Sequence, residues 1–254
     1  MKIMKTRYFI FITFKGTLYH GWQLQPGSVT VQKIIDDALS TILNEKISTT
    51  GAGRTDSGVH ALFFCAHFES TVTDLSDRNN LLFRLNRNLP KDISVSRIVK
   101  VRDDAHARFS AVSRTYRYYI SRIKDPFIDE LSWFVHCDID IKTMNKACKI
   151  FMKYNDFTSF SRLHSGTKTN LCKIFHASWT EESNRLIFTI KADRFLRNMV
   201  RAITGTMVDV GKGKTSTGEF EEIIKAKERC RAGKSAPAKG LFLEDIEYVQ
   251  EIFS

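Results

Sequence analysis

Apolar residues recur along this chain with two different spacings. Over residues 8–14 they are nearly continuous, which is typical of a buried strand. Over residues 31–43 they return at every third or fourth position, which predicts an amphipathic helix with Ser28 or Thr30 as its N-cap. The chain is therefore expected to open with a strand followed by a helix.

The same two spacings predict elements for the rest of the chain. Strands are expected near residues 46–50, 62–68, 93–101, 113–122, 172–180, 185–191 and 241–248. Helices are expected from residue 81 to just before Pro90, and near 141–152, 195–210 and 217–227. The stretch 124–136 has no regular pattern. Strands and helices mixed in this way predict an α+β protein.

We expect two similar halves, residues 1–105 and 106–254. Each half should be a mainly antiparallel sheet with helices on one face. A length of 254 residues suits two such domains of about 100–150 residues each. A ligand cleft between two such halves is a common arrangement, so we expect the active site there.

Charge is the most informative bulk property. Lys and Arg number 39 against 28 Asp and Glu, a formal net charge of +11. Such an excess favours a polyanionic partner, because basic side chains release the counterions of phosphates. Arginines also lie beside aromatic residues at 108–109, 114–119 and 194–197. This interleaving suits a surface that holds phosphates and stacks a base, although basic strands with an aromatic core look similar.

Cysteine usage and apolar run length point to a cytoplasmic protein. The five cysteines are odd in number and no two have C-x-x-C spacing, so neither a disulfide framework nor a structural zinc site is expected. The longest apolar run, residues 8–14, is much shorter than the roughly 20 residues of a membrane-spanning helix.

Motifs for nucleotide cofactors and catalytic metals fail on their spacing. The GKT at 213–215 resembles the end of a P-loop, but the first glycine of that motif would fall at Val208. The G-x-G at 51–53 is not a dinucleotide fingerprint, because Asp56 stands where its third glycine belongs. The histidines show no H-E-x-x-H spacing. We therefore expect no cofactor and no metal.

The segment 51–61, GAGRTDSGVHA, is the strongest candidate for chemistry. Its glycines permit tight turns and a close approach of a ligand to the backbone. Arg54 and Asp56 lie two positions apart, and a nearby arginine lowers the pKa of a carboxyl group. A desolvated carboxylate can act as a nucleophile or a base. The alternative is an aspartate that only organises the turn, and the loop by itself favours that alternative.

This segment resembles the catalytic signature of the tRNA pseudouridine synthase A (TruA) family. Other blocks resemble the same family in the same order: YHGWQLQ at 19–25, TVQ at 30–32, NRNLP at 86–90, HARFSA at 106–111, RTYRY at 114–118, NDFTSF at 155–160, FLRNMVR at 195–201 and APAKGL at 236–241. Departures are small: Ser57 stands where many relatives have Ala, and Asp193 and Arg194 precede the FLRNMVR block. The resemblance spans residues 19–243.

The resemblance implies a cofactor-free enzyme that isomerises uridine to pseudouridine at positions 38, 39 and 40 of the tRNA anticodon stem–loop. It implies that Asp56 is the nucleophile, that Arg201 pairs with Asp56, and that Tyr116 stacks on the target base. Leu243 is either part of the pocket or ordinary core. The resemblance also implies a homodimer.

Contacts to tRNA are expected from basic residues around the cleft, namely Arg54, Arg108, Arg114 and Arg197. The target uridine should be extruded from its stack to reach Asp56. Three alternatives stay open: a related enzyme with other tRNA targets, a basic RNA-binding module without catalysis, and a phosphotransferase with an aspartyl nucleophile. The last would need clustered carboxylates for Mg²⁺, which the Asp56 loop does not offer.

Overall fold

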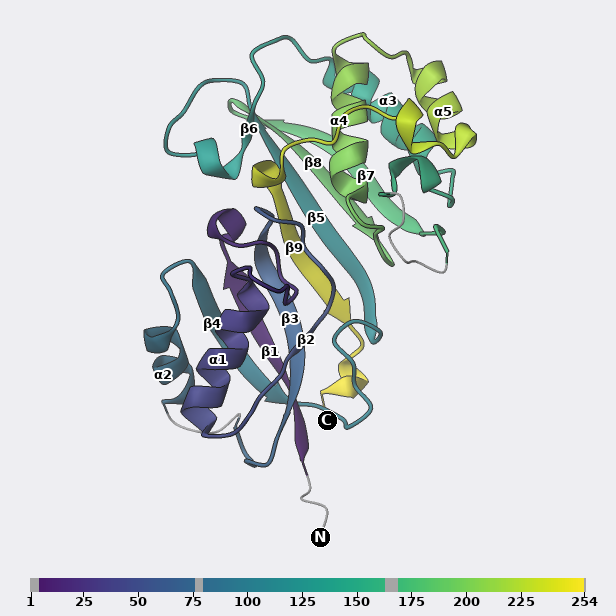
Figure 1. Cartoon of the computed structure of the whole chain (residues 1–254). Coiled ribbons are helices and arrows are strands. Elements are labelled where there is room, and N and C mark those ends of the chain that lie inside the picture. Colours follow the sequence, from purple (N-terminus) through teal and green to yellow (C-terminus); the bar gives the residue numbers. More distant parts are fainter. Residues whose placement is uncertain (1–4, 76–79, 163–168, 254) are drawn as a thin grey trace. The chain divides into compact units, whose positions relative to one another are not determined.

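The computed structural model describes residues 5–75, 80–162 and 169–253, which belong to two compact units (Figure 1). The first unit consists of Met1–Val112 together with Leu243–Ser254, and the second of Ser113–Phe242. These units differ from the expected halves, 1–105 and 106–254, in two ways. The first division lies later in the chain, and the C-terminal segment returns to the first unit.

The first unit is built on an antiparallel sheet with two α-helices. Its elements are β1 (Thr6–Phe14), α1 (Val31–Leu43), β2 (Thr50–Gly51), β3 (His60–Ser70), α2 (Leu81–Asn88), β4 (Ile93–Lys100) and most of β9 (Leu241–Tyr248). Strand β1 runs antiparallel to both β3 and β4, and the strands lie in the order β4-β1-β3-β9. The short β2 pairs with β3.

Strand β1 is buried on both of its faces, which explains its nearly continuous apolar sequence. From Tyr8 to Ile12 no side chain exposes more than 2% of its surface. The ring of Phe9 lies 5.2 Å from that of Tyr248 and 6.1 Å from that of Phe253, so the C-terminal segment covers part of β1. Helix α1 contributes Ile35 and its other apolar residues to the core.

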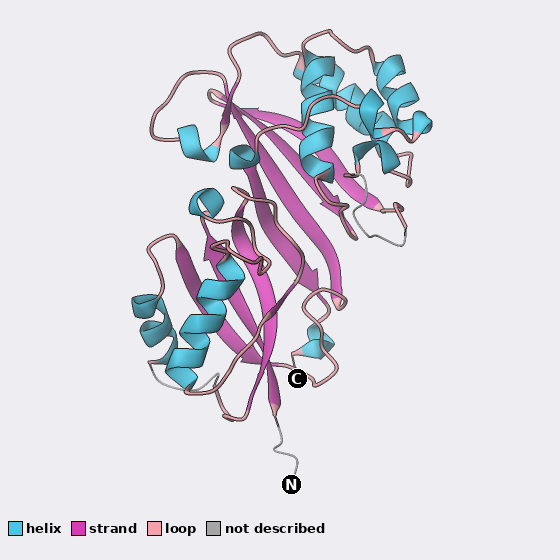
Figure 2. Ribbon diagram, in the orientation of Figure 1, coloured by secondary structure: helices cyan, strands magenta, loops and turns pink. Residues whose placement is uncertain are grey.

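The second unit repeats the combination of an antiparallel sheet with helices. Its elements are β5 (Ala111–Ser121), β6 (Trp133–Phe134), α3 (Ile141–Phe151), β7 (Ile174–Glu182), β8 (Arg185–Ala192), α4 (Met199–Gly211) and α5 (Thr217–Ala226). Strand β8 pairs antiparallel with β5 and β7, whereas β6 runs parallel to β5. The α-helices gather on one side of the strands in each unit (Figure 2). The predicted α+β class with mainly antiparallel sheets is confirmed.

Several helices begin at the residues that their capping sequences predict. Thr30 caps α1 by accepting a hydrogen bond from the Lys33 N–H, and Asp140 caps α3 through the Thr143 N–H. Ser216 and Glu219 form a reciprocal capping box at α5. Of the two caps proposed for the first helix, Thr30 is therefore the one used.

Two expectations about local structure were wrong. Residues 46–49 are not a strand, and only Thr50–Gly51 pairs with β3. Helix α4 begins at Met199 rather than near Phe195, because Asn198 adopts a left-handed conformation with φ of 65° that interrupts a helix. The stretch 124–136 is largely irregular, as expected, apart from the 3-10 turn Asp129–Leu131 and the two-residue strand β6. No helix in the described ranges is long and apolar enough to cross a membrane.

Candidate active site

Asp56 lies in the first unit, in the loop that joins β2 to β3. The pairing of β2 continues through a 2.8 Å hydrogen bond from the Ala52 N–H to the Cys65 carbonyl oxygen. Further on, the Val59 N–H donates to the Asp56 carbonyl oxygen at 3.1 Å and closes a turn. Asp56 is the first residue of this turn and is partly buried. The backbone around the carboxylate is thus fixed before any ligand arrives.

The chain segment Tyr19–Gly21 packs against this turn. The Tyr19 carbonyl oxygen accepts hydrogen bonds from the Gly58 N–H at 3.3 Å and from the Ser57 hydroxyl at 3.2 Å. Gly21 has a φ of +81°, and a Cβ there would lie 2.2 Å from the Thr55 carbonyl oxygen. Only glycine fits this position, because any side chain would push the backbone of the Asp56 turn away.

Tyr19 and Trp22 are themselves anchored in the unit. The Tyr19 hydroxyl donates a 2.7 Å hydrogen bond to Asp92, and burial together with that bond raises the pKa of Tyr19. Trp22 exposes only 2% of its surface, and its ring centroid lies 4.2 Å from that of Phe64 and 6.4 Å from that of Phe14. The segment against which the Asp56 turn packs is therefore fixed to the core.

Helix α1 holds both the segment that precedes this loop, at Thr49, and the YHGWQLQ segment, at Leu24. The Gln32 amide donates to the Thr49 carbonyl oxygen at 2.7 Å and accepts from the Leu24 N–H at 3.0 Å. One carboxylate oxygen of Asp36 accepts both the N–H and the hydroxyl of Thr49, at 2.8 and 2.6 Å. Burial raises the pKa of Asp36, and the two bonds from Thr49 oppose that shift. These side chains hold Thr49, which was expected to belong to a strand.

Arg54 lies at the surface of the same loop, two residues before Asp56. Its side chain is exposed, and its Nε donates a hydrogen bond to the side-chain oxygen of Gln23. This contact ties the loop to the YHGWQLQ segment a second time. It leaves the guanidinium at a surface where a phosphate could reach it.

Arg108 belongs to a second loop of the first unit, residues 106–110, which is bound through two histidine rings. Nδ1 of His67 accepts the Ala107 N–H at 3.2 Å. Nδ1 of His106 accepts the N–H groups of Arg108 and Phe109, at 3.1 and 3.3 Å. An imidazole nitrogen can accept a hydrogen bond only while it carries no proton. The shape of this loop therefore requires both rings to be neutral.

The surroundings of these rings favour the neutral form. Burial lowers the pKa of His67 to about 4, the nearby His106 and Arg7 groups lower it further, and Glu69 opposes the shift. Burial also lowers the pKa of His106, with further contributions from Arg7 and Arg108. At neutral pH both rings consequently keep the lone pairs that the loop needs.

In the second unit, β5 contacts the segment that leads into α4. Arg114 donates from Nη1 to the Asp193 carbonyl oxygen at 2.7 Å. The Tyr116 ring meets the Phe195 ring edge to face, with centroids 5.1 Å apart. Two neighbouring positions of β5, on the same face of the strand, thus bind the start of the FLRNMVR block.

Arg201, in the first turn of α4, is bound to Ala236 through both its backbone and its side chain. Its Nε donates to the Ala236 carbonyl oxygen at 2.8 Å, and its carbonyl oxygen accepts the Ala236 N–H at 2.9 Å. The next residue, Pro237, accepts a 2.7 Å hydrogen bond from the buried Tyr118 hydroxyl. The APAKGL block and the FLRNMVR block are therefore neighbours, and their contact orients the Arg201 guanidinium.

Arg197 and Leu243 occupy contrasting environments. Arg197 has an exposed side chain just before α4, and its carbonyl oxygen accepts the Arg162 N–H at 3.1 Å. Leu243 lies in β9 and exposes 3% of its surface. Burial of this kind suits a pocket wall and ordinary core equally, so both roles expected for Leu243 stay open.

Comparison with known proteins identifies the family. A family model described as tRNA pseudouridine synthase matches residues 10–110 and 147–249. The tRNA pseudouridine synthase A of Bacteroides fragilis is 50% identical over 248 residues, which cover 97% of this chain and 98% of that protein. The chain belongs to the tRNA pseudouridine synthase family. The predicted resemblance is thereby confirmed.

Other relatives of the same name cover a similar share of the chain. The tRNA pseudouridine synthase A of Parabacteroides distasonis is 50% identical over 247 residues, covering 97% of this chain and 98% of that protein. The one from Acetivibrio thermocellus is 38% identical over 241 residues, covering 94% and 98%. The similarity to tRNA pseudouridine synthases therefore extends over both units.

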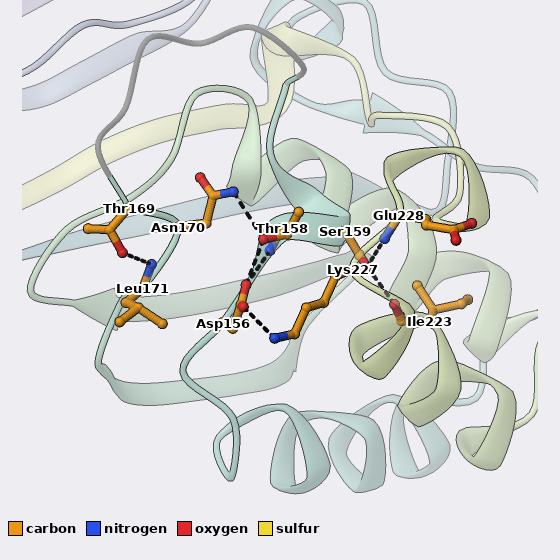
Figure 3. Close-up of polar contacts among 9 residues, drawn as sticks. All are labelled: Asp156, Thr158, Ser159, Thr169, Asn170, Leu171, Ile223, Lys227 and Glu228. Atoms are coloured by element: carbon orange, nitrogen blue, oxygen red, sulfur yellow. Dashed lines mark hydrogen bonds and ion pairs between the residues drawn. The ribbon is translucent and has the colours of Figure 1, made fainter.

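The NDFTSF block, which resembles the pseudouridine synthase family, supports the second unit (Figure 3). One carboxylate oxygen of Asp156 accepts the N–H and the hydroxyl of Thr158, at 3.1 and 2.6 Å, and the other lies 2.9 Å from the Lys227 ammonium. The buried Ser159 hydroxyl donates to the Ile223 carbonyl oxygen at 2.6 Å and accepts the Glu228 N–H at 3.0 Å. This block therefore fastens α5 to the segment that continues to Arg162.

The structure groups the expected pseudouridine synthase residues within each unit. In the first, Arg54 and Asp56 share one loop, whereas Arg108 lies in another. In the second, Arg114, Tyr116, Arg197 and Arg201 all contact or belong to residues 193–201. The pairing of Arg201 with Asp56 joins different units and stays a prediction. Within the described ranges, no group of three or more His, Cys, Asp or Glu side chains could hold a metal.

No local pattern singles out the side chains that support the loops. Gln32 lies in the TVQ block and His106 in the HARFSA block, but the functions of Asp36 and His67 have no local signature. Each accepts hydrogen bonds from backbone N–H groups that are distant in sequence. A partial signal existed at Asp156, because Asp followed two positions later by Thr is typical of an Asx turn.

Replacing Gly21 should test how closely the Asp56 turn is packed. We expect Gly21→Ala to lower the free energy of unfolding by at least about 2 kcal/mol, because it combines a left-handed φ with a collision against Thr55. Gly53 lies in the loop that carries Asp56, and a Cβ there would meet open space. Gly53→Ala should therefore change the free energy of unfolding by less than about 0.5 kcal/mol. Urea unfolding measures both, and equal effects would contradict the packing described.

Lowering the pH should reduce the free energy of unfolding, because His67 is neutral in the folded first unit. The unfolded chain takes up a proton as the pH falls through the ordinary pKa of 6.5, whereas folded His67 does so only near 4. Stability from this residue is thus complete above pH 6.5 and is lost progressively towards pH 4. His67→Asn retains an acceptor oxygen but cannot titrate. Its free energy of unfolding should fall less between pH 7 and pH 5 than that of the wild type, and an identical fall in both would exclude this role for His67.

Proposed function

We propose that this protein isomerises uridine to pseudouridine at positions 38, 39 and 40 of the tRNA anticodon stem–loop, with Asp56 as its nucleophile. Relatives at about 50% identity over nearly the whole chain carry the name tRNA pseudouridine synthase A. The observation that carries the assignment to Asp56 is its place on a turn that is packed against Gly21 and closed by the Val59 N–H. Such preorganisation is what a reacting carboxylate requires.

The reaction breaks the bond between uracil N1 and ribose C1′, turns the base, and forms a bond from C5 to C1′. C5 loses a proton and N1 gains one, so neither oxidant nor reductant is consumed. Asp56 attacks the nucleoside or removes one of its protons. Attack at C1′, attack at C6 and a route through C2′ all use the same carboxylate.

Other side chains of the proposed site have complementary tasks. Arg201 pairs with Asp56, for which its fixed Nε–Ala236 bond is a suitable anchor. Tyr116 stacks on the target base, and the edge-to-face contact with Phe195 holds its ring for that purpose. Leu243 lines the pocket or completes the core.

Contacts with the tRNA backbone come from arginines in both units. The side chains of Arg54, Arg108 and Arg197 are exposed, whereas Arg114 is partly buried against Asp193. Phosphate contacts of this kind would offset the few kcal/mol that flipping a uridine out of a stem costs. The formal charge of +11 supports the same interaction. A non-catalytic RNA-binding module is not favoured, because the curated relatives are named as synthases.

Removing the carboxylate tests the catalytic assignment. We expect Asp56→Asn to lower the rate of pseudouridine formation by at least about a thousandfold, because the group acts in the chemical step. Binding of an unmodified tRNA transcript should change little. Pseudouridine mapping and a binding titration measure the two effects. Asp37→Asn, the same substitution at an exposed position of α1, is the control and should retain activity. Full turnover by Asp56→Asn would exclude it as the nucleophile.

We propose further that the protein is a homodimer and is located in the cytoplasm. Light scattering should then give a mass about twice the 29.2 kDa of one chain. A mass equal to one chain, at concentrations where the enzyme is active, would exclude the dimer.

A further inference from the structure

Phe109 is a large apolar side chain that the first unit leaves in solvent. It exposes 75% of its surface. Its ring touches the His106 ring, with centroids 4.4 Å apart, and the Arg108 guanidinium lies over it at 5.5 Å. These contacts orient the ring without covering it. Folding therefore gains little from the ring at this position, and what distinguishes it from other exposed apolar side chains is the guanidinium beside it.

The loop that carries Phe109 is hydrogen-bonded along its length. The Phe109 and Arg108 N–H groups donate to His106, and the Ala107 carbonyl oxygen accepts the Tyr248 hydroxyl at 2.6 Å. The Ser110 hydroxyl accepts the His106 N–H at 2.9 Å, and the His106 carbonyl oxygen accepts the Ser110 N–H at 2.9 Å. A ring presented by such a loop loses little conformational freedom on binding, which favours affinity.

We propose that Phe109 stacks on an unpaired base of the bound RNA, while Arg108 holds a neighbouring phosphate. An aromatic ring beside a guanidinium is the combination that suits a nucleotide, because the ring takes the base and the cation takes the phosphate. The inference rests on the proposed function, which gives tRNA as the bound RNA and Asp56 as the place of reaction.

The stacked base is not the target uridine. The Asp56 turn ends at Val59, directly before β3, whereas His67, which binds the Phe109 loop, lies seven residues along β3 from His60. Seven residues of a strand span roughly 23 Å. Phe109 therefore contacts a nucleotide some distance from the reacting one, and its contribution is to binding rather than to the chemical step.

Phe127 shows that exposure alone does not make such a site. It exposes 92% of its surface, its N–H donates to the Asp125 carboxylate at 2.9 Å, and the next acidic residues in the sequence are Asp129, which pairs with Lys239, and Glu130. Acidic neighbours repel a phosphate backbone. Phe127 is thus the matched control, an exposed phenyl group over whose ring no guanidinium or ammonium of the described residues lies.

The test measures the dissociation constant and the steady-state kinetics of the full-length protein with an unmodified tRNA transcript. Phe109→Ala should raise Kd and KM about tenfold, the size of one base–aromatic stack, and leave kcat unchanged. Phe109→Trp should restore tight binding, whereas Phe109→Leu should not. Phe127→Ala should behave as the wild type. Because Phe109 is exposed, these variants should unfold at the wild-type temperature.

Salt dependence separates the contributions of the two neighbours. Arg108→Ala should reduce the slope of log Kd against log salt by about one, as expected when one phosphate contact is lost. Phe109→Ala should leave that slope unchanged, because stacking releases no counterions. A changed slope for Phe109→Ala would overturn the division of roles.

Three results would overturn the proposal itself. The first is unchanged Kd and KM in Phe109→Ala, and the second is full rescue by Phe109→Leu. The third is a Phe109→Ala variant that loses the oligomeric mass of the wild type but keeps its affinity for RNA. The last would show that Phe109 contacts a second copy of the chain. Failure of the proposed function has a different signature. In that case wild-type protein would form no pseudouridine, while tRNA binding would still depend on Phe109.

Discussion

The turn that carries Asp56 depends on the absence of a side chain at Gly21. A Cβ at this position would lie 2.2 Å from the Thr55 carbonyl oxygen, so the two backbones touch directly. The same approach brings the Tyr19 carbonyl oxygen within reach of the Gly58 N–H. Tyr19 in turn is fixed by Asp92. The position of the carboxylate thus follows from one close contact between two loops, each of which is anchored in the core.

Polar side chains of the first unit form hydrogen bonds with backbone groups that have no partner in the sheet. Asp36 accepts the Thr49 N–H, His60 accepts the Gly16 N–H at 2.9 Å, and the Asn86 amide exchanges two 2.8 Å hydrogen bonds with Val95. Irregular segments inside a folded unit need such partners, because a buried N–H without an acceptor is costly. The loops near Asp56 and Arg108 are ordered by this means although they contain no regular structure.

The sequence predicted what depends on neighbouring residues and missed what depends on distant ones. Strand β1 and helix α1 with its Thr30 cap follow from local spacing, and both are observed. The expected strand at 46–50 failed because its backbone is bound by α1, which no local pattern records. The return of the C-terminal segment to the first unit is likewise a long-range event. Asp56 could be selected from its motif, whereas His67 could not, since its role as an acceptor exists only after folding.

In the second unit, Arg201 is positioned by the same kind of close backbone contact at a glycine that positions Asp56 in the first. Gly205, one turn along α4 from Arg201, has no Cβ, and one placed there would lie 1.8 Å from the Lys234 carbonyl oxygen. The chain at 234–236 can therefore lie directly on the helix, where Ala236 receives the Nε hydrogen bond of Arg201. A lysine could not replace this arginine, because only a planar guanidinium is oriented by a bond from Nε. In each unit, then, a glycine lets two backbones meet, and the contact sets the direction of a charged side chain. Sites that must align reacting groups closely favour such rigid supports over flexible ones.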